Sequence, residues 1–468
     1  MFFSIHTLGC KLNQLETEAI TDAFRRNSFT APENEPAAAG IIIVNTCTVT
    51  SMAEQKARRL IRKLLIEHPA ACLIITGCYA QLNKDEIEKE FPERTFVLPG
   101  DKKDSLLDLP VFLNGGFLKG DFAKGMEQSS CRLGELIGSW VLENTKRPAD
   151  SRDGSFRYRP EKFTSHSRGF LKIQDGCDRR CSYCRVSLAR GKSRSIEADA
   201  ALKELLALEE RGFNEAVLTG VDITQYRDSG LDLAGLLELM LNGTNTIRLR
   251  LSSIDPGKDL DRFSEKFFEV LKNKRIRPHF HLSLQSGSDT ILAKMGRAYS
   301  SADIEKTVET LRSVKEDPFL ACDIIAAFPG ESDAEFEKTH VLCERLDFAW
   351  IHAFPFSRRP GTAAYDFPDR VNERESKKRV ELLTALARKG RARYIDRWKG
   401  REVEAIVESG RKPGGAFVPG VSENYLKLLI GYKEGPVPLP GSLLCCRITE
   451  EAPKDMHYDI LAEEKSPF

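Results

Sequence analysis

The chain has 468 residues, 41% of them hydrophobic, so it is long enough to form two or three domains rather than one core. Its 70 Lys and Arg balance 69 Asp and Glu, so overall charge gives no reason to expect nucleic acid as a partner, and any such binding must come from local patches. The opening sequence MFFSIHTLGCKLNQLE has no basic leader, and no later stretch approaches about 18 apolar residues. We therefore expect a cytoplasmic protein, without secretion or a membrane span.

The N-terminal part alternates between strand and helix patterns. Apolar, β-branched runs cover residues 2–9, 41–46 and 72–77, and helical patterns follow the first two at 12–27 and 51–68. This order predicts a parallel sheet covered by helices. The first helix should be amphipathic, with Leu12, Leu15, Ala19, Ala23 and Phe24 on its apolar face and Glu16, Asp22 and Arg25 off it.

A second series of strand patterns follows a polar, arginine-rich segment at 145–168 that reads as a linker. The strand patterns cover residues 169–175, 215–221, 247–253, 279–285, 319–328 and 350–356, with helical patterns in the gaps. Six β–α units predict a barrel or partial barrel whose chemistry lies at the carboxyl ends of its strands.

The last part of the chain changes pattern again. After about residue 395, short apolar runs are separated by Gly and Pro, which is typical of a small antiparallel barrel. The predicted fold class is therefore α/β, with an open parallel α/β domain, a partial (β/α)6 barrel and a small antiparallel β-barrel. We place the boundaries at 1–140, a linker at 141–168, a core at 169–395 and a last domain at 396–468.

Three cysteines share one short loop after the strand GFLKIQDG: Cys177, Cys181 and Cys184. A 4Fe-4S cluster has four irons, so three thiolates leave one iron open for a small molecule. The alternative is structural zinc, but zinc generally needs a second nearby pair or histidines, and the sequence has none close by. The spacing favours the cluster.

Cys10, Cys47 and Cys78 each follow a predicted strand of the N-terminal sheet. Parallel strands bring such positions to one edge, where ligands of open α/β sheets bind, so these thiols could hold a second cluster. They could equally be three inert buried thiols. Gly9 and Gly77 precede two of them, which suits tight turns.

Other candidate ligands carry weaker signals. His279 and His281 alternate along a predicted strand without a third metal ligand, so they read as interior packing or substrate contacts. The remaining cysteines show no common arrangement and read as core or neutral surface thiols: Cys72, Cys131, Cys322, Cys343, Cys445 and Cys446.

The two cysteine sets, in this order, resemble those of the methylthiotransferases of the radical S-adenosylmethionine superfamily. Further stretches look similar to that family: VLTGVD at 217–222, LRLSSIDP at 249–256, LSLQSGSD at 282–289, DIIAAFPGE at 323–331 and HAFPFSRRPGTAA at 352–364. The resemblance spans nearly the whole chain. It implies an N-terminal domain with an auxiliary cluster, a radical core and a C-terminal TRAM barrel that recognises substrate.

Within that family, three stretches look most like the group that modifies N6-threonylcarbamoyladenosine at position 37 of tRNA: GCKLNQLE at 9–16, NTCTVT at 45–50 and QDGCDRRCSYC at 174–184. The alternatives are groups that act on isopentenyladenosine in tRNA or on an aspartate of a ribosomal protein. Two departures from the family pattern concern loops, with Val186 in place of an Ile-x-Pro type segment and Ala327 where Gly is common.

The resemblance implies two 4Fe-4S clusters and S-adenosyl-L-methionine as cofactors. The open iron at Cys177, Cys181 and Cys184 would chelate S-adenosylmethionine, and its reductive cleavage would give a radical that takes hydrogen from C2 of the adenine. The implied partners are the tRNA anticodon loop, a sulfur donor and an electron donor such as flavodoxin or ferredoxin. Candidate cofactor contacts at strand ends are Tyr183, Thr219, Gly220, Gln285 and Ser286.

RNA binding has local support between Glu373 and Arg401, where 11 Lys or Arg face 4 Asp or Glu. This segment could also be an ordinary solvated helix. Tyr394, Trp398 and Tyr425 could stack on bases or belong to a core.

Two interpretations from other classes remain at this point: a non-catalytic iron–sulfur protein for electron transfer, and a zinc-stabilised RNA-binding protein. The long predicted barrel and the open cluster site oppose the first. Zinc without iron or acid-labile sulfide would reveal the second.

Overall fold

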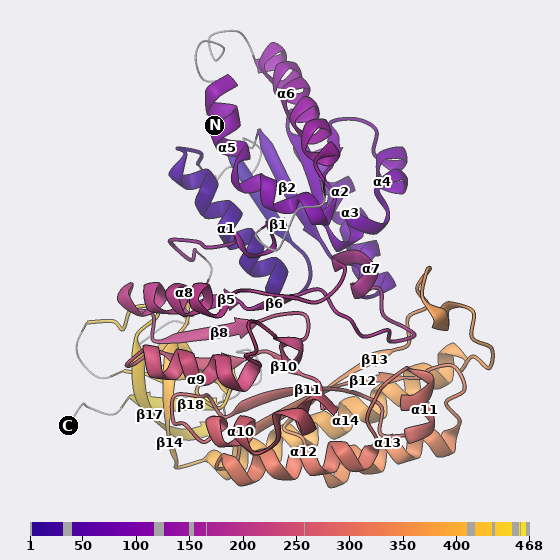
Figure 1. Ribbon diagram of the computed structural model, residues 1–468, viewed down its shortest axis with the longest axis vertical. Coiled ribbons are helices and arrows are strands. Elements are labelled where there is room, and N and C mark those ends of the chain that lie inside the picture. The colour runs from indigo at the N-terminus through magenta and orange to yellow at the C-terminus, as the bar shows by residue number, and fades with distance from the viewer. Residues whose placement is uncertain are drawn as a thin grey trace.

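The computed structural model describes residues 2–30, 40–116, 126–148, 154–164, 166–256, 258–409, 417–432, 436–451, 458 and 460–464. The predicted linker at 141–168 and the last predicted domain at 396–468 therefore lie partly outside the described residues. Figure 1 shows the N-terminal sheet above a central array of strands, with the C-terminal barrel at one end of that array. No helix of the described part is both long and apolar enough to cross a membrane.

The N-terminal sheet is parallel, as predicted, with its strands in chain order. The strands are β1 (Phe3–Thr7), β2 (Ile41–Thr46), β3 (Cys72–Gly77) and β4 (Thr95–Val97). Around them lie α1 (Lys11–Arg26), α2 (Ser51–Glu67), α3 (Cys78–Leu82), α4 (Lys84–Glu90), η2 (Gly100–Leu107), α5 (Leu109–Gly116) and α6 (Met126–Lys146).

The sheet is buried on both faces, which explains its uninterrupted apolar strands. Ile41 and Ile43 of β2 pack in one core with α1 and α6, whereas Ile42 and Val44 pack in another with α2, α3 and α4. Successive side chains of a strand point to opposite faces, so both cores draw on the same run of residues.

The central array holds the six predicted strand patterns in two parallel sheets, β5-β8-β9 and β10-β11-β12-β13. Only Ser252 separates β9 from β10, so the sheets follow one another as one open array. The strands are β5 (Gly169–Lys172), β8 (Glu215–Thr219), β9 (Arg248–Leu251), β10 (Ser253–Ile254), β11 (His279–Gln285), β12 (Phe319–Ala326) and β13 (Trp350–Pro355).

Helices and short elements connect these strands. The helices are α7 (Val186–Arg190), α8 (Ala198–Glu210), α9 (Leu233–Gly243), α10 (Lys258–Leu271), α11 (Asp289–Lys294), α12 (Ser301–Val314) and α13 (Asp333–Arg345). Single 3-10 turns are η3 (Gly154–Phe156), η4 (Ile223–Gln225) and η5 (Ala363–Tyr365), and β6 (Gln174–Asp175) pairs with β7 (Arg194–Ser195).

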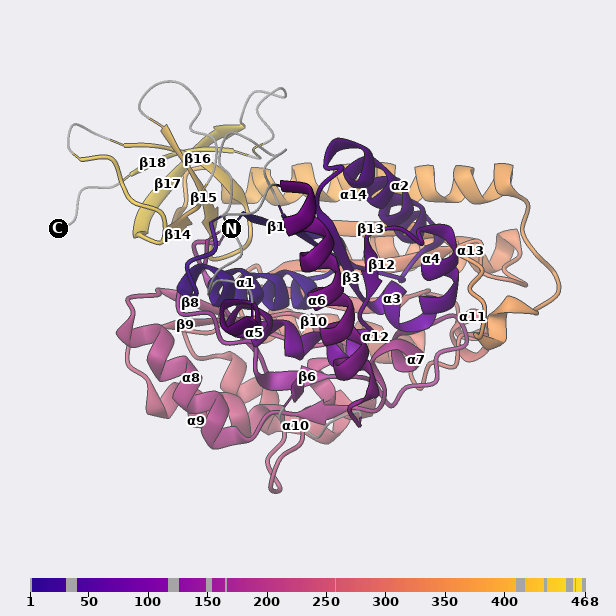
Figure 2. The same cartoon turned by 90° about the horizontal axis from the view of Figure 1, so that it is seen from above.

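The C-terminal strands form a closed barrel in the order β14-β15-β16-β18-β17. They are β14 (Glu402–Val407), β15 (Phe417–Ser422), β16 (Lys427–Gly431), β17 (Leu443–Glu451) and β18 (Ile460–Glu464), and the long helix α14 (Glu373–Trp398) leads into them. Figure 2 shows α14 running along the array toward the barrel. Tyr394 and Trp398 are buried in the core that joins helix and barrel, so they are core residues rather than base-stacking surfaces.

A buried carboxylate ties the array to the C-terminal barrel. Glu215, at the start of β8, pairs with Arg250 at 2.6 Å and with Arg277 at 2.9 Å. Arg250 also donates to the carbonyl oxygens of Ser422 and Glu423, each at 3.1 Å. Burial opposes ionisation of Glu215, but the two arginines outweigh it and hold its pKa far below the usual range. The barrel therefore attaches near the amino ends of the strands, away from their carboxyl ends.

Ala327 occupies a backbone conformation that favours glycine, with φ at +62°. Its amide donates to the carboxylate of Glu331 at 2.6 Å, which holds the turn. A non-glycine residue pays about 1–2 kcal/mol there, and glycine loses roughly 0.5–1 kcal/mol more chain entropy on folding. Ala327→Gly should therefore raise the free energy of unfolding in urea by about 0.5–1 kcal/mol. Ala326→Gly, one residue earlier in β12, is the control and should lower it; a loss of stability in both variants would contradict the prediction.

Candidate functional site

The loop with Cys177, Cys181 and Cys184 follows β6 and precedes α7, at the carboxyl end of the array. Backbone hydrogen bonds hold the loop in place. The Cys177 amide donates to the carbonyl oxygen of Gly191 at 3.1 Å, and the Ser182 amide donates to that of Met295 at 2.9 Å. These bonds fix the backbone, so the positions of the three side chains do not depend on a bound group alone.

Two of the loop sulfurs accept hydrogen bonds. The Gln225 side-chain amide lies 3.2 Å from Cys177 Sγ, and the Val186 amide lies 3.4 Å from Cys184 Sγ. Burial raises the pKa of the Cys184 thiol to about 12. Donors aimed at sulfur are a feature of iron–sulfur sites, where they tune the reduction potential.

The three N-terminal cysteines gather at the carboxyl edge of their sheet. Cys10 lies just before α1, Cys47 follows β2, and Cys78 begins α3 directly after β3. Gly9 makes this approach possible, because a Cβ there would lie 2.8 Å from Cys47 Cβ and its φ is +118°. Gly77 has φ of +96°, and a Cβ there would lie 2.3 Å from a backbone oxygen of β2.

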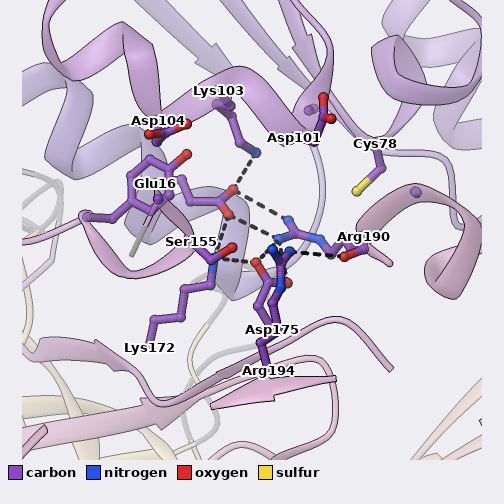
Figure 3. Close-up of a pocket in the computed structure, with 15 residues that line it drawn as sticks. Glu16, Cys78, Asp101, Lys103, Asp104, Ser155, Lys172, Asp175, Arg190 and Arg194 are labelled. Carbon is purple, nitrogen blue, oxygen red and sulfur yellow. Dashed lines mark hydrogen bonds and ion pairs between the residues drawn. The ribbon is translucent and has the colours of Figure 1, made fainter. Parts of the chain in front are cut away.

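A buried ion network lies beside Cys78 and joins the N-terminal part to the array (Figure 3). Glu16 of α1 pairs with Arg190 at 3.0 Å, with Lys172 at 3.2 Å and with Lys103. Asp175 shares two of these cations, at 2.6 Å from Lys172 and 3.0 Å from Arg190. A cavity of about 60 Å³ opens onto this network.

Part of the polar side of α1 is also buried, which its periodicity alone does not predict. Glu16 and Asp22 were placed off the apolar face, yet both are buried in the structure. Glu16 meets the cations described above, and Asp22 accepts the Glu161 amide at 2.9 Å. Apart from Lys103, these partners come from the segment after residue 154, so that segment covers much of this side of the helix.

A second ionic contact joins the two cysteine regions. Glu54 of α2 pairs with Arg185 at 3.1 Å and with Arg359. Arg185 directly follows Cys184, and the hydroxyl of Thr48, one residue after Cys47, accepts from Arg359 at 3.0 Å. The contact therefore fixes residues next to a cysteine of each set against one another.

The loop cysteines and one cysteine of the N-terminal set border a cavity of about 390 Å³ at the carboxyl ends of the array strands. Cys10, Cys177, Cys181 and Cys184 all line it. The remaining wall comes from polar and aromatic side chains of the array, among them Tyr183, Asp222, Ser253, Asp255, Gln285, Arg297, Asp323 and Phe354. Its volume falls within the range of small-molecule sites.

Two arginines and two aspartates in this wall neutralise one another. Arg179 pairs with Asp222 at 2.7 Å and with Asp255 at 3.1 Å, and Arg297 pairs with Asp255 at 2.6 Å. Sequence reasoning assigned these residues no role. A usable signal was present, because Asp222 and Asp255 each follow a predicted strand closely, as ligand-binding residues of such arrays do.

Of the five expected cofactor contacts, Tyr183 and Gln285 line the cavity. Thr219 is buried at the end of β8, and Gly220 packs against Gln174, where a Cβ would lie 2.9 Å from the side-chain oxygen. The Ser286 hydroxyl lies 3.1 Å from that of Thr339, behind the cavity wall. Tyr183 and Gln285 therefore remain candidate cofactor contacts, whereas the other three residues pack against the protein.

The cysteine sets fit clusters better than single ions. All twelve cysteines are free thiols, and in the described residues no three Cys, His, Asp or Glu side chains converge on the position of one metal ion. A 4Fe-4S cluster takes each thiolate on a different iron, so its ligands stay apart. The three thiols at the edge of the N-terminal sheet suit that arrangement. The three loop thiols suit it too, and two of their sulfurs accept hydrogen bonds from amides.

Family models and relatives match most of this chain. Residues 171–343 match the Radical SAM superfamily, and residues 3–99 match Uncharacterized protein family UPF0004. The chain is 38% identical to the threonylcarbamoyladenosine tRNA methylthiotransferase MtaB of Treponema pallidum, over 96% of this chain and 98% of that protein. It is 28% identical to the tRNA-2-methylthio-N(6)-dimethylallyladenosine synthase of Geobacillus kaustophilus, over 96% and 80%. Among solved structures, the radical S-adenosylmethionine methyltransferase TsrM of Kitasatospora setae aligns with a TM-score of 0.47 at 16% identity, covering 78% of this chain and 76% of that one.

The fold and the cysteine loop define a radical S-adenosylmethionine enzyme. More particularly, the chain belongs to the methylthiotransferases of that superfamily, because its similarity to them runs from end to end. Iron–sulfur clusters and S-adenosylmethionine are the cofactors of this class, as predicted. Membership also sets aside the interpretations as a non-catalytic iron–sulfur protein and as a zinc-stabilised RNA-binding protein.

Proposed function

We propose that this protein adds a 2-methylthio group to N6-threonylcarbamoyladenosine at position 37 of tRNA, next to the anticodon. The observation that carries the proposal is a cavity lined by the three loop cysteines and by Cys10, which shares its sheet edge with Cys47 and Cys78. A reaction that forms a carbon–sulfur bond by a radical route needs the radical source and the sulfur source beside the same substrate atom.

We assign the ligands as Cys177, Cys181 and Cys184 for the radical cluster and Cys10, Cys47 and Cys78 for the auxiliary cluster. When bound, the first cluster supplies the electron that cleaves S-adenosylmethionine, which gives access to an unactivated carbon. Tyr183 and Gln285 are the candidate contacts for S-adenosylmethionine, because both line the cavity beside the cysteines.

The chain's own residues hold the two sites at a fixed separation. The Glu54 contact joins the residues after Cys47 and Cys184, and the Glu16 network joins α1, which follows Cys10, to Arg190 of α7. The Arg179, Arg297, Asp222 and Asp255 pairs position the cavity wall without adding net charge. These ion pairs fix the shape of the cavity before a ligand binds.

The choice of nucleoside rests on similarity, since the relative named for threonylcarbamoyladenosine is 38% identical and the one named for dimethylallyladenosine is 28% identical. The partners we propose are tRNA, a sulfur donor and an electron donor such as flavodoxin or ferredoxin, all in the cytoplasm. The C-terminal barrel would recognise tRNA, together with exposed cations of α14: Arg374, Lys377, Lys378, Arg388 and Lys389. The domains we propose are 1–140, a linker at 141–168, 169–395 and 396–468.

Deletion of the gene should abolish 2-methylthio-threonylcarbamoyladenosine in cellular tRNA, and complementation should restore it. Mass spectrometry of digested tRNA measures both outcomes, with unmodified threonylcarbamoyladenosine expected to accumulate in the deletion strain. If the isopentenyl derivative changed instead, the reaction class would stand and the nucleoside would be wrong. If no thiomethylated nucleoside changed, a protein substrate would replace tRNA.

A further inference from the structure

The inner face of the array carries one polar side chain on each of four neighbouring strands. These are Ser253 of β10, His281 of β11, Asp323 of β12 and His352 of β13. Ser253 lies opposite His281 in the strand register, and Asp323 lies opposite His352. Within each pair the register places the two side chains side by side. Between β11 and β12, His281 lies opposite Ala321, two residues before Asp323, so the row formed by the four side chains runs obliquely across the sheet.

Hydrogen bonds run along this row. Ser253 Oγ lies 3.1 Å from His281 Nδ1, and His281 Nε2 lies 3.1 Å from Asp323 Oδ1. A carboxylate only accepts, so Nε2 of His281 carries a proton and donates to Asp323, while Nδ1 shares a hydrogen bond with the serine hydroxyl. His281 is thus fully engaged, and its ring lies 5.3 Å from that of His352.

The end of the row keeps one acceptor and one donor. The second carboxylate oxygen of Asp323 has no partner among the described residues, and Asp323 lines the cavity. Trp350 Nε1 donates to His352 Nδ1 at 3.2 Å, which leaves the proton of the neutral imidazole on Nε2 as a donor. An adjacent donor and acceptor complement an amide or urea group, which presents C=O and N–H side by side.

The preceding histidine of β11 is enclosed, unlike the end of the row. His279, two residues earlier on β11, is buried with its ring 4.1 Å from that of Tyr425 and 5.5 Å from that of Phe319. His352, by contrast, is exposed. Asp323 faces the cavity and His352 is exposed, so both side chains are accessible to a ligand.

An aromatic surface lies beside the row. Phe354, two residues after His352 on the same face of β13, is 42% exposed although it is a large apolar side chain, and it lines the cavity. Its ring is nearly parallel to that of His352, with 11° between the planes and 6.3 Å between the centroids. Exposed aromatic rings of this kind stack on unpaired bases.

We propose that Asp323 and His352 form a specificity site for the carbamoyl group on the target adenine, and that Phe354 stacks on the base. This inference rests on the function proposed above. A site built to hydrogen-bond a polar group rejects an analogue that lacks it, because its own groups are then left unpaired. An isopentenyl group offers neither donor nor acceptor, so this pair of residues selects against it.

The test is binding of RNA anticodon stem-loops to the anaerobically prepared holoprotein, followed by fluorescence anisotropy. One stem-loop carries threonylcarbamoyladenosine and the other carries unmodified adenosine at the same position. The wild-type protein should prefer the first by about tenfold or more, the effect of one or two buried hydrogen bonds. Asp323→Ala and His352→Ala should each abolish most of this preference while leaving the affinity for the unmodified stem-loop unchanged.

Matched variants distinguish the two roles. His352→Gln retains an N–H donor and should keep part of the preference, whereas Phe354→Ala should weaken binding of both stem-loops by the same factor. Glu309→Ala, on the exposed surface of α12, should change neither. The proposal is overturned if the wild type shows no preference, if the Asp323 and His352 variants keep it, or if they lose affinity for both RNAs equally. The nucleoside analysis above is independent of these outcomes, so the proposed function can stand while the specificity site falls.

Discussion

Replacing Cys177, Cys181 and Cys184 by alanine should remove about half of the iron from anaerobically reconstituted protein and abolish methylthiolation. If both cysteine sets hold cubanes, the wild-type protein binds about eight irons per chain, and each set accounts for about four. The loop itself should persist, because its backbone bonds to Gly191 and Met295 do not involve sulfur. Iron and acid-labile sulfide analysis measures the loss directly.

The reciprocal variant, with alanine at Cys10, Cys47 and Cys78, should lose the other half of the iron. Reductive cleavage of S-adenosylmethionine should continue in that variant while thiomethylated product disappears, which separates the two roles. Cys131 and Cys445 are exposed and belong to neither set, so alanine at these positions is the control and should leave eight irons. A wild-type content near four irons per chain would contradict the proposal of two clusters.

Glu16→Gln should lower the free energy of unfolding by about 3–5 kcal/mol, the usual effect of removing one partner from a buried ion network. Glu16 is 1% exposed and lies among Lys103, Lys172 and Arg190. Without its charge, Asp175 alone would pair with Lys172 and Arg190, and Lys103 would lose its carboxylate partner. Because the network joins α1 to α7, iron binding at both cysteine sets should also weaken.

The same network predicts how stability depends on pH. Burial opposes ionisation of Glu16, but the charges of Arg190, Lys103 and Lys172 outweigh it, so its folded-state pKa lies well below the ordinary value of 4.5. A depressed carboxylate pKa stabilises the fold above the unfolded-state pKa, and that contribution is lost as pH falls below 4.5 toward the folded-state value. Wild-type stability should therefore fall in this acid range more steeply than that of Glu16→Gln.

Urea unfolding followed by circular dichroism tests both statements. Glu238→Gln is the matched control, because Glu238 pairs with Lys266 on the surface and is 50% exposed. An exposed pair contributes about 0–1 kcal/mol, so this variant should unfold nearly as the wild type does. If Glu16→Gln lowered the free energy of unfolding no more than the control does, the network would not stabilise the fold. The explanation for the burial of Glu16 would then be wrong.

Much of the architecture was determined by the sequence itself. The six strand patterns of the array correspond to β5, β8, the β9 and β10 pair, β11, β12 and β13. The strands β1 to β3 and β14 to β17 also lie where the patterns predict, whereas no pattern was assigned to β4 or β18. Strand patterns are local, since they depend on apolar side chains repeating along a few residues. The cysteines were visible for a related reason. Four of them directly follow such a run, Cys10, Cys47, Cys78 and Cys177, and the short loop after Cys177 carries Cys181 and Cys184.

Only the tertiary structure decided how distant residues meet. The periodicity of α1 shows which face is apolar, yet it cannot show that Glu16 is buried, because its partner Arg190 lies 174 residues away in the chain. Likewise, His281 could be packing or a substrate contact until the structure placed it opposite Ser253 in the register and within 3.1 Å of Asp323. That Cys10 and the loop cysteines line one cavity follows from long-range packing, which no local pattern encodes, and it is this packing that turns two sets of thiols into one candidate active site.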